Sequence, residues 1–200
     1  MSETTITMPL GNRKVGRVYT FSLPTLKSCP GASDWCREHC YASRYEKFRP
    51  SVREAYSRNW RISQRPGQLV NHVLNALPLY AGHMRIHVAG DFFSKEYIEA
   101  WRLICELRPN TQFWAYTRSW VIPELWDALD ELRQLPNIQL FASVDAGMPN
   151  PPENWRKAFI ESDSRAKGLV CPHQEDRVQS CLDCGYCFRK GKGDVIFKPH

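Results

Sequence analysis

The sequence predicts an α/β fold built on a mostly parallel β-sheet. Runs rich in β-branched and aromatic side chains recur at residues 17–23, 85–89, 111–117 and 137–145. Segments with helical periodicity separate these runs, and strands that alternate with helices are typical of parallel sheets with right-handed crossovers. Because polar residues follow the end of each strand, we expect them to meet at one edge of the sheet.

The composition favours a soluble, cytoplasmic protein. The 200 residues suit one domain with a small appendage, 42% are hydrophobic, and no apolar run is long enough to cross a bilayer. Residues 1–14 form a polar arm with no secretory signal, so disulfides are not expected and the clustered cysteines are better explained as metal ligands. The net charge of +6 permits a nucleic-acid partner, and no membrane contact is expected.

The first cysteine group lies on a loop that leaves the strand at 17–23, where Pro30 and Gly31 break regular structure. The loop carries three thiols spaced C-x6-C-x3-C: Cys29, Cys36 and Cys40. A structural zinc site normally has four protein ligands, so three thiols favour a metal centre with one position open to a small ligand. His39 adjoins Cys40, and adjacent helical residues point about 100° apart, so we expect an exposed or core His39 rather than a ligand.

Three helices are expected next, over residues 41–49, 51–63 and 67–77, with Ser51 and Glu54 forming a capping pattern. Residues 44–65 hold seven basic residues: Arg44, Lys47, Arg49, Arg53, Arg58, Arg61 and Arg65. Four aromatic residues are interleaved with them: Tyr45, Phe48, Tyr56 and Trp60. One interpretation is a face that binds phosphates and stacks bases. The other, which the three- and four-residue spacing favours, is an amphipathic helix pair with core aromatics and solvated arginines.

The strand at 85–89 ends in Ala89, Gly90 and Asp91, and Ser94 can cap a helix over residues 95–107. A glycine at a strand end lets the backbone approach a ligand closely, and Asp91 would then point into a site. An ordinary strand–turn–helix junction explains the same residues equally well. Cys105 stands alone among apolar residues and is expected in the core.

The strand–helix unit then recurs, with a helix expected over residues 123–134. The strand at 111–117 ends in Thr117 and Ser119, and the strand at 137–145 ends in Ser143 and Asp145. We therefore expect these polar side chains to gather around the first cysteine loop.

The C-terminal part is expected to contain a short helix over residues 153–161, a strand over 167–170 and a last strand over 194–197. It holds a second cysteine group spaced C-x9-C-x2-C-x2-C: Cys171, Cys181, Cys184 and Cys187. Four thiols in seventeen residues indicate a metal site, and the tight triplet favours an iron–sulfur cluster over zinc. We accordingly divide the chain into a main unit, residues 1–170, and a cysteine-rich segment, residues 171–200, packed on the same domain.

Several of these motifs together resemble the phage "gene product 88" family over roughly residues 15–190: residues 20–24, 28–31, 40–42, 87–94 and 116–119, and the final Cys-x2-Cys-Gly-x-Cys. The layout is in turn similar to that of the radical S-adenosylmethionine (SAM) superfamily. That resemblance implies a partial (β/α) barrel with mostly parallel strands. This chain differs from the superfamily in two features. Its first cysteines are spaced C-x6-C-x3-C where the superfamily usually has C-x3-C-x2-C, and its turn reads Ala-Gly-Asp where the superfamily has Gly-Gly-Glu.

The resemblance also implies roles for individual residues. Cys29, Cys36 and Cys40 would hold a 4Fe–4S cluster whose open iron binds SAM, and Ala89, Gly90 and Asp91 would face its methionine part. Candidates for contacts with ribose or substrate are Thr117, Ser119, Ser143 and Asp145. The second cysteine group would hold an auxiliary cluster.

Two hypotheses from different classes follow. The first is an iron–sulfur enzyme of radical SAM type that acts on an unidentified substrate. The second is a protein without catalysis, in which zinc or iron–sulfur centres stabilise the fold and the basic helices bind nucleic acid. A thiol redox protein is disfavoured because no isolated Cys-x2-Cys begins a helix.

Overall fold

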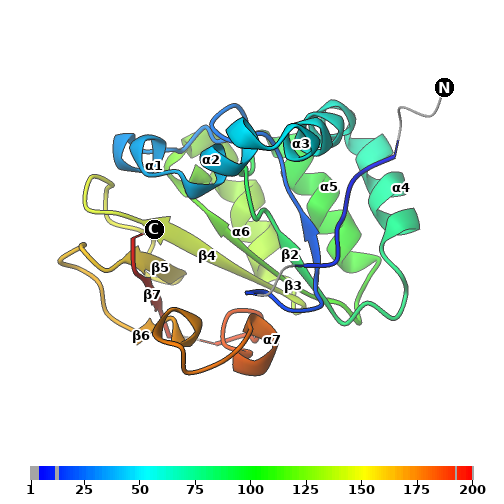
Figure 1. Ribbon diagram of the computed structural model, residues 1–200. Helices are drawn as coiled ribbons and strands as arrows, with labels where there is room; N and C mark the ends of the chain where they lie inside the picture. The colour runs from blue at the N-terminus through cyan, green and yellow to red at the C-terminus, as the bar shows by residue number, and fades with distance from the viewer. Residues whose placement is uncertain (1–4, 12–13, 192, 200) are drawn as a thin grey trace.

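The computed structural model describes residues 5–11, 14–191 and 193–199, so the expected polar arm lies partly outside the described residues. Within them, seven strands form one all-parallel sheet in the order β1-β2-β3-β4-β5-β7-β6 (Figure 1). The strands are β1 (Tyr19–Phe21), β2 (His83–Ile86), β3 (Gln112–Thr117), β4 (Ile138–Val144), β5 (Arg156–Ile160), β6 (Leu169–Val170) and β7 (Val195–Phe197).

Helices lie in the connections from β1 to β2, β2 to β3, β3 to β4 and β6 to β7. The α-helices are α1 (Asp34–Glu38), α2 (Tyr41–Phe48), α3 (Pro50–Ser63), α4 (Pro66–Ala76), α5 (Lys95–Glu106), α6 (Trp126–Gln134) and α7 (Cys181–Cys184). The 3₁₀ helices are η1 (Ser119–Val121), η2 (Pro123–Leu125) and η3 (Pro172–Glu175). No helix in the described ranges is both long and apolar enough to cross a membrane.

The two faces of the sheet have different covers. Strands β1 to β5 lie side by side in chain order. Because crossover connections between parallel strands are right-handed, the helices that connect these strands lie on the same face of the sheet. There Met84, Phe113 and Leu140 belong to the main apolar core with residues of α4, α5 and α6. On the other face, Trp114 and Tyr116 pack against residues of the C-terminal segment, including Phe188. In Figure 1 this segment, in orange, runs below the sheet.

Several expected elements are confirmed. The runs rich in β-branched and aromatic residues at 111–117 and 137–145 form β3 and β4. The Ser94 hydroxyl accepts a hydrogen bond from the Tyr97 amide at 3.2 Å and caps α5, as its place before the helical run predicts. The sheet is entirely parallel, where the sequence predicted a mostly parallel one.

The helix expected over residues 153–161 is wrong, because residues 156–160 form β5 between β4 and β7. Phe159 packs into the main core, whereas Ala158 packs on the opposite face, so both faces of this strand are buried. A strand buried on both faces has no polar–apolar alternation, and its local pattern does not distinguish it from a short helix.

Two boundaries also differ from the expected ones. Strand β2 ends at Ile86 rather than residue 89, because His87 has a φ of +61° and leaves the extended conformation. Helix α3 begins at Pro50 with Arg49 as its N-cap residue, so the expected capping pattern at Ser51 is not used. Proline suits the first turn of a helix, because the N–H group that it lacks would have no hydrogen-bond partner within the helix at that position.

The C-terminal segment contributes to the sheet itself. Strand β7 pairs with β5 on one side and with β6 on the other, with Ala158 and Leu169 both in register with Val195. The four C-terminal cysteines thus lie on a connection between two strands of the same sheet.

Candidate functional site

The first cysteine loop lies at the carboxyl edge of the sheet, where β1 to β4 end. The Leu23 amide, just beyond β1, donates to the Ala89 carbonyl, which follows β2, at 2.9 Å. The Tyr41 hydroxyl, one residue after Cys40, donates to the Val88 carbonyl at 2.6 Å. These bonds fasten both ends of the loop to the turn after β2.

The three thiols of the loop influence one another electrostatically. Burial, followed by the charge of Asp91 and an interaction with Cys36, raises the pKa of the Cys29 thiol to about 12. Burial also raises the pKa of the Cys36 thiol, Arg118 opposes that rise, and Cys40 adds to it. All three thiols are partly buried, and Cys36 lies close enough to Cys29 and to Cys40 for their charges to interact. Their convergence on one metal centre stays a prediction.

Two glycines allow the loop to approach the strand ends closely. A Cβ atom on Gly31 would lie 2.2 Å from the carbonyl oxygen of Arg118, beyond the end of β3. Gly90 has a φ of +85°, and a Cβ atom there would lie 2.6 Å from Leu23 Cβ and 2.7 Å from Ser28 Oγ. The close approach that Gly90 permits is thus to the cysteine loop.

Asp91 is buried, and its carboxylate joins the turns after β2 and β3. Its Oδ1 accepts from the Phe92 amide at 2.7 Å, and its Oδ2 accepts from the Arg118 amide at 2.8 Å. Burial raises the pKa of the Asp91 carboxyl, while hydrogen bonds from Thr117 and these two amides oppose the rise. Both carboxylate oxygens therefore bond to the protein itself.

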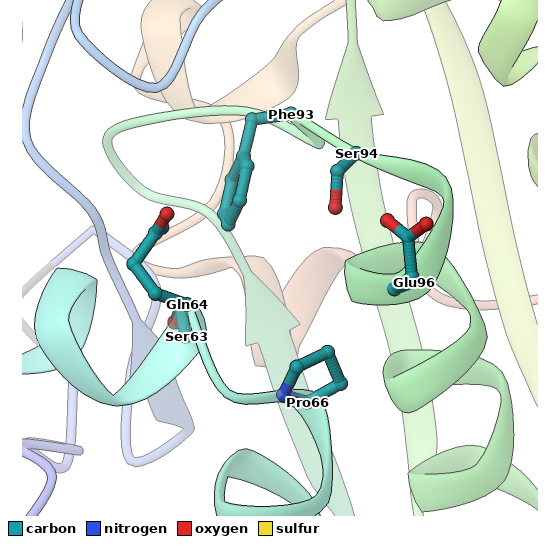
Figure 2. Close-up of a pocket in the computed structure, with 6 residues that line it drawn as sticks. All are labelled: Ser63, Gln64, Pro66, Phe93, Ser94 and Glu96. Atoms are coloured by element: carbon teal, nitrogen blue, oxygen red, sulfur yellow. The ribbon is translucent and has the colours of Figure 1, made fainter.

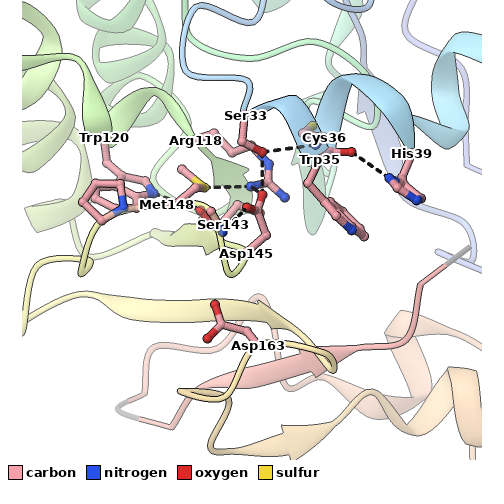
Figure 3. Close-up of polar contacts among 12 residues, drawn as sticks. Ser33, Trp35, Cys36, His39, Arg118, Trp120, Ser143, Asp145, Met148 and Asp163 are labelled. Atoms are coloured by element: carbon pink, nitrogen blue, oxygen red, sulfur yellow. Dashed lines mark hydrogen bonds and ion pairs between the residues drawn. The ribbon is translucent and has the colours of Figure 1, made fainter.

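Asp145, at the end of β4, connects to the cysteine loop through Ser33 and Arg118 (Figure 3). Its Oδ2 accepts from Ser33 Oγ at 2.6 Å and from Arg118 Nη1. The same Ser33 Oγ accepts from the Cys36 amide at 3.1 Å and caps α1. This chain of contacts fixes the start of α1, and with it Cys36.

Sequence reasoning did not assign roles to Arg118 or Ser33. Arg118 lies between two of the predicted site residues, Thr117 and Ser119, so the polar group after β3 is the signal that points to it. Ser33 was not recognised as the N-cap of α1, although a serine before Asp34 is a common helix start.

The remaining strand-end residues support the local backbone. Thr117 Oγ1 accepts from the Ser119 amide at 3.0 Å, and the Ser143 carbonyl accepts from Trp120 Nε1 at 3.0 Å. Thr117 and Ser119 are buried, whereas the Ser143 side chain is partly exposed. Ala89 is also buried, in the turn beside the cysteine loop.

A pocket of about 210 Å³ borders the cysteine loop. Its lining comes from that loop and from the segments after β3 and β4: Pro30, Gly31, Ala32, Ser33, Val121, Gly147, Met148 and Pro149. Met148 Sδ also accepts from Arg118 Nη1 at 2.8 Å, so the pocket adjoins the contacts around Asp145.

A larger pocket of about 350 Å³ lies between the end of α3 and the start of α5 (Figure 2). It is lined by Ser63, Gln64, Pro66, Phe93, Ser94 and Glu96. This lining holds no thiol, imidazole or basic side chain, and the Ser94 hydroxyl is already engaged as the cap of α5.

His39 is exposed, as expected. Its ring stacks on Trp35 with centroids 4.7 Å apart, and its Nδ1 lies 3.0 Å from the Trp35 carbonyl oxygen (Figure 3). Cys105 is fully buried in α5, which confirms the core position expected for it.

The second cysteine group lies against the face of the sheet opposite the main helices. Burial, together with Cys181 and Cys171, raises the pKa of the Cys187 thiol to about 12, while a hydrogen bond with Tyr116 and the charge of Arg156 oppose the rise. The pKa of Cys181 is also raised, first by burial, with Cys171 and Cys184 adding to the rise. Cys181 thus lies close enough to each of Cys171, Cys184 and Cys187 for their charges to interact.

Cations lie close to two thiols of this second group, Cys181 and Cys187. Arg85 and Lys14 both lower the pKa of Cys181, against the effect of burial. Arg156 is buried and donates to four oxygens, among them the Tyr186 and Arg189 carbonyls at 3.3 and 3.0 Å. Three cations therefore lie near these two thiols.

No set of three or more His, Cys, Asp or Glu side chains in the described ranges is arranged to hold a single metal ion. The 4Fe–4S, zinc and SAM expectations therefore stay predictions.

Helices α2 and α3, which carry the basic residues, only partly match the expected amphipathic pair with core aromatics and solvated arginines. Tyr45 and Phe48 are 52% and 74% exposed, so the expectation that the aromatics lie in the core is wrong for these two. Trp60 packs against the core and contacts Phe93, with ring centroids 4.6 Å apart. Arg58 pairs with Glu54 at 2.8 Å. The other six basic side chains are exposed: Arg44, Lys47, Arg49, Arg53, Arg61 and Arg65.

Comparison with known proteins places the chain among phage proteins. It is 29% identical to the Gene 88 protein of Mycobacterium phage L5 and 32% identical to that of Mycobacterium phage D29, each over 94% of this chain and 89% of the relative. No solved structure matches. The family model described as "Gene product 88" matches residues 3–151, which include the first cysteine loop and the ends of β1 to β4. The chain therefore belongs to the gene product 88 family.

Proposed function

We propose that this protein is an iron–sulfur protein of radical SAM type, with a 4Fe–4S cluster held by Cys29, Cys36 and Cys40. The observation that carries the proposal is the position of three interacting thiols on one loop at the carboxyl edge of an all-parallel sheet. Enzymes built on parallel α/β folds place their chemistry at this edge. The proposal treats the seven-stranded sheet as a partial barrel.

The donor set fits such a cluster in its chemistry. Thiolates are soft ligands that suit iron–sulfur clusters, and three of them leave one iron without a protein ligand. The raised pKa values of Cys29 and Cys36 mean that metal binding must displace protons, and the positive charge of Arg118 favours the thiolate of Cys36. The adjoining pocket of about 210 Å³ offers space for a small ligand beside the loop.

When bound, the cluster would supply an electron and a coordination position for SAM. The chain's own residues would hold the loop and shape the space beside it. Since both oxygens of Asp91 already bond to backbone amides, we assign Asp91 to positioning. Asp145 positions α1 through Ser33, and the turns at Ala89–Gly90, Thr117–Ser119 and Ser143 surround the loop.

We further propose that the second cysteine group holds an auxiliary centre. A metal with four thiolate ligands is anionic overall, and the cations Lys14, Arg85 and Arg156 would balance that charge. A second 4Fe–4S cluster and a zinc ion both satisfy this charge argument, and metal analysis separates them.

The test is to purify the protein without oxygen and to measure iron, sulfide and zinc, followed by EPR spectra of the reduced protein with and without SAM. We expect roughly eight irons per chain, as two 4Fe–4S clusters require, and a spectrum that changes when SAM is added. Roughly four irons with zinc would keep the first cluster and assign zinc to the second group. Iron that does not respond to SAM would remove the radical SAM part, and zinc alone would refute the proposal.

A further inference from the structure

One surface of the molecule combines exposed basic and exposed aromatic side chains. It is formed by α2 and the first turn of α3, and we call it the α2–α3 surface: Arg44, Tyr45, Lys47, Phe48, Arg49 and Arg53. All six side chains are exposed. In Figure 1, α1, α2 and α3 follow one another along the upper side of the molecule.

Most of the net charge of the chain lies in the segment that contains this surface, residues 44–65. Residues 44–65 hold seven of the 27 basic and two of the 21 acidic side chains, which leaves them with five of the six net positive charges. The two acidic residues already have partners, because Glu46 accepts from Thr25 at 2.8 and 2.5 Å and Glu54 pairs with Arg58. Over the described ranges, no basic residue of the α2–α3 surface forms an ion pair. Among the residues described, these basic side chains are therefore free of carboxylates that would compete with a bound polyanion.

The aromatic rings carry a second, independent signal. Tyr45 and Phe48 are 52% and 74% exposed, although burying such rings usually stabilises a fold. Each ring lies beside a cation, with Arg49 5.2 Å from the Tyr45 centroid and Lys47 5.6 Å from the Phe48 centroid. Cations next to exposed rings are the combination on which unpaired bases stack while their phosphates are neutralised.

We propose that the α2–α3 surface binds single-stranded nucleic acid. A single strand has free base faces for Tyr45 and Phe48, whereas a duplex buries its base faces by stacking. Helix α2 begins at Tyr41, directly after Cys40, so a bound strand would lie beside the cysteine loop. The inference does not depend on metal at that loop.

The test is fluorescence anisotropy with the full-length protein and labelled oligonucleotides: single-stranded DNA, single-stranded RNA and duplex DNA of equal length. Each should exceed about 16 nucleotides, the upper site size of a single-strand-binding OB fold, so that length does not limit binding. We expect tighter binding to single strands than to the duplex, and an affinity that falls steeply as salt rises.

Two sets of variants separate charge from stacking. The triple change Lys47→Gln, Arg49→Gln and Arg53→Gln should lower the slope of log affinity against log salt by roughly two to three. The double change Tyr45→Ala and Phe48→Ala should weaken single-strand binding by roughly tenfold or more and leave the salt slope unchanged. These side chains are exposed, so circular dichroism should show that both variants fold.

Matched controls lie elsewhere on the surface. Tyr80→Ala removes a ring that is 87% exposed on the turn between α4 and β2. Lys167→Gln removes an exposed charge on the connection between β5 and β6, away from α2 and α3. The control variants should bind like the unchanged protein. Absence of binding at low salt, equal binding of duplex and single strand, or equal effects of the control changes would overturn the proposal.

Discussion

Arg118 and Asp145 form an ion pair that joins the ends of β3 and β4 beneath the cysteine loop (Figure 3). The two side chains are only 11% and 3% exposed. Asp145 also accepts from Ser33, which caps the helix that carries Cys36. The pair therefore connects the sheet to the proposed metal ligand.

Replacing Asp145→Asn should leave the Arg118 charge without its partner in a largely buried position. Breaking a buried pair by removing one partner costs on the order of 3–5 kcal/mol, and we expect the lower end of that range because Arg118 keeps some exposure. Urea unfolding measures the loss. The control is Arg102→Gln, whose pair with Glu106 is 38% exposed on both sides and should contribute less than about 1 kcal/mol. Equal losses in the two variants would contradict the structural role given to Asp145.

Gly31→Ala should loosen the docking of the cysteine loop. The added Cβ would lie 2.2 Å from the Arg118 carbonyl oxygen, which is backbone and has little freedom to move. We expect a loss of at least about 2 kcal/mol in the free energy of unfolding, together with a lower iron content. Gly67→Ala is the matched control, because a Cβ there meets nothing within 4 Å and alanine favours helix α4. If Gly31→Ala retains full stability and iron, the loop does not sit as described.

Cysteine changes test which thiols hold metal. Alanine at Cys29, Cys36 or Cys40 should remove about four irons per chain and abolish the response of the EPR spectrum to SAM. Alanine at Cys184 should remove metal from the second group and leave that response in place. Cys105→Ala controls for thiol loss, since Cys105 is buried in α5 away from both groups, and it should retain the full iron content. Full iron in the Cys36→Ala variant would refute the assignment of the first cluster.

His87 should make the fold sensitive to mild acid. Burial, with a contribution from Arg85, lowers its pKa to about 3, whereas an unfolded histidine has a pKa of about 6.5. The unfolded chain therefore binds a proton between these values that the folded chain does not, so stability is complete above pH about 6.5 and falls as the pH drops toward 3. Thermal unfolding at several pH values measures this.

The variant His87→Asn should remove most of that pH dependence between about pH 4.5 and 6.5. Asparagine tolerates the φ of +61° at this position better than most residues, so the variant should fold. Tyr97→Phe is the control, because it removes the 2.7 Å contact of the tyrosine hydroxyl with His87 Nε2 but leaves the titrating ring. An unchanged slope in His87→Asn would assign the acid sensitivity to other groups.

Local patterns in the sequence were sufficient for some elements. The β-branched and aromatic content of residues 111–117 and 137–145 predicted β3 and β4, and Ser94 predicted the start of α5, because these signals act within a few residues. The same signals predicted that polar turns and the cysteine loop share one edge of a parallel sheet, since the carboxyl ends of parallel strands meet there.

Tertiary contacts decided what the local pattern left open. Residues 156–160 become a strand only because β4 and β7 offer backbone partners on both sides. Gly90 and Gly31 are needed because the cysteine loop and the strand ends approach each other closely. Arg118 pairs with Asp145, 27 residues away in the chain, because β3 and β4 bring the two side chains together. The sequence alone thus determined the parallel α/β architecture and the two cysteine groups. Which charges and backbone atoms surround the thiols depends on contacts between distant segments, and only the folded chain determines those.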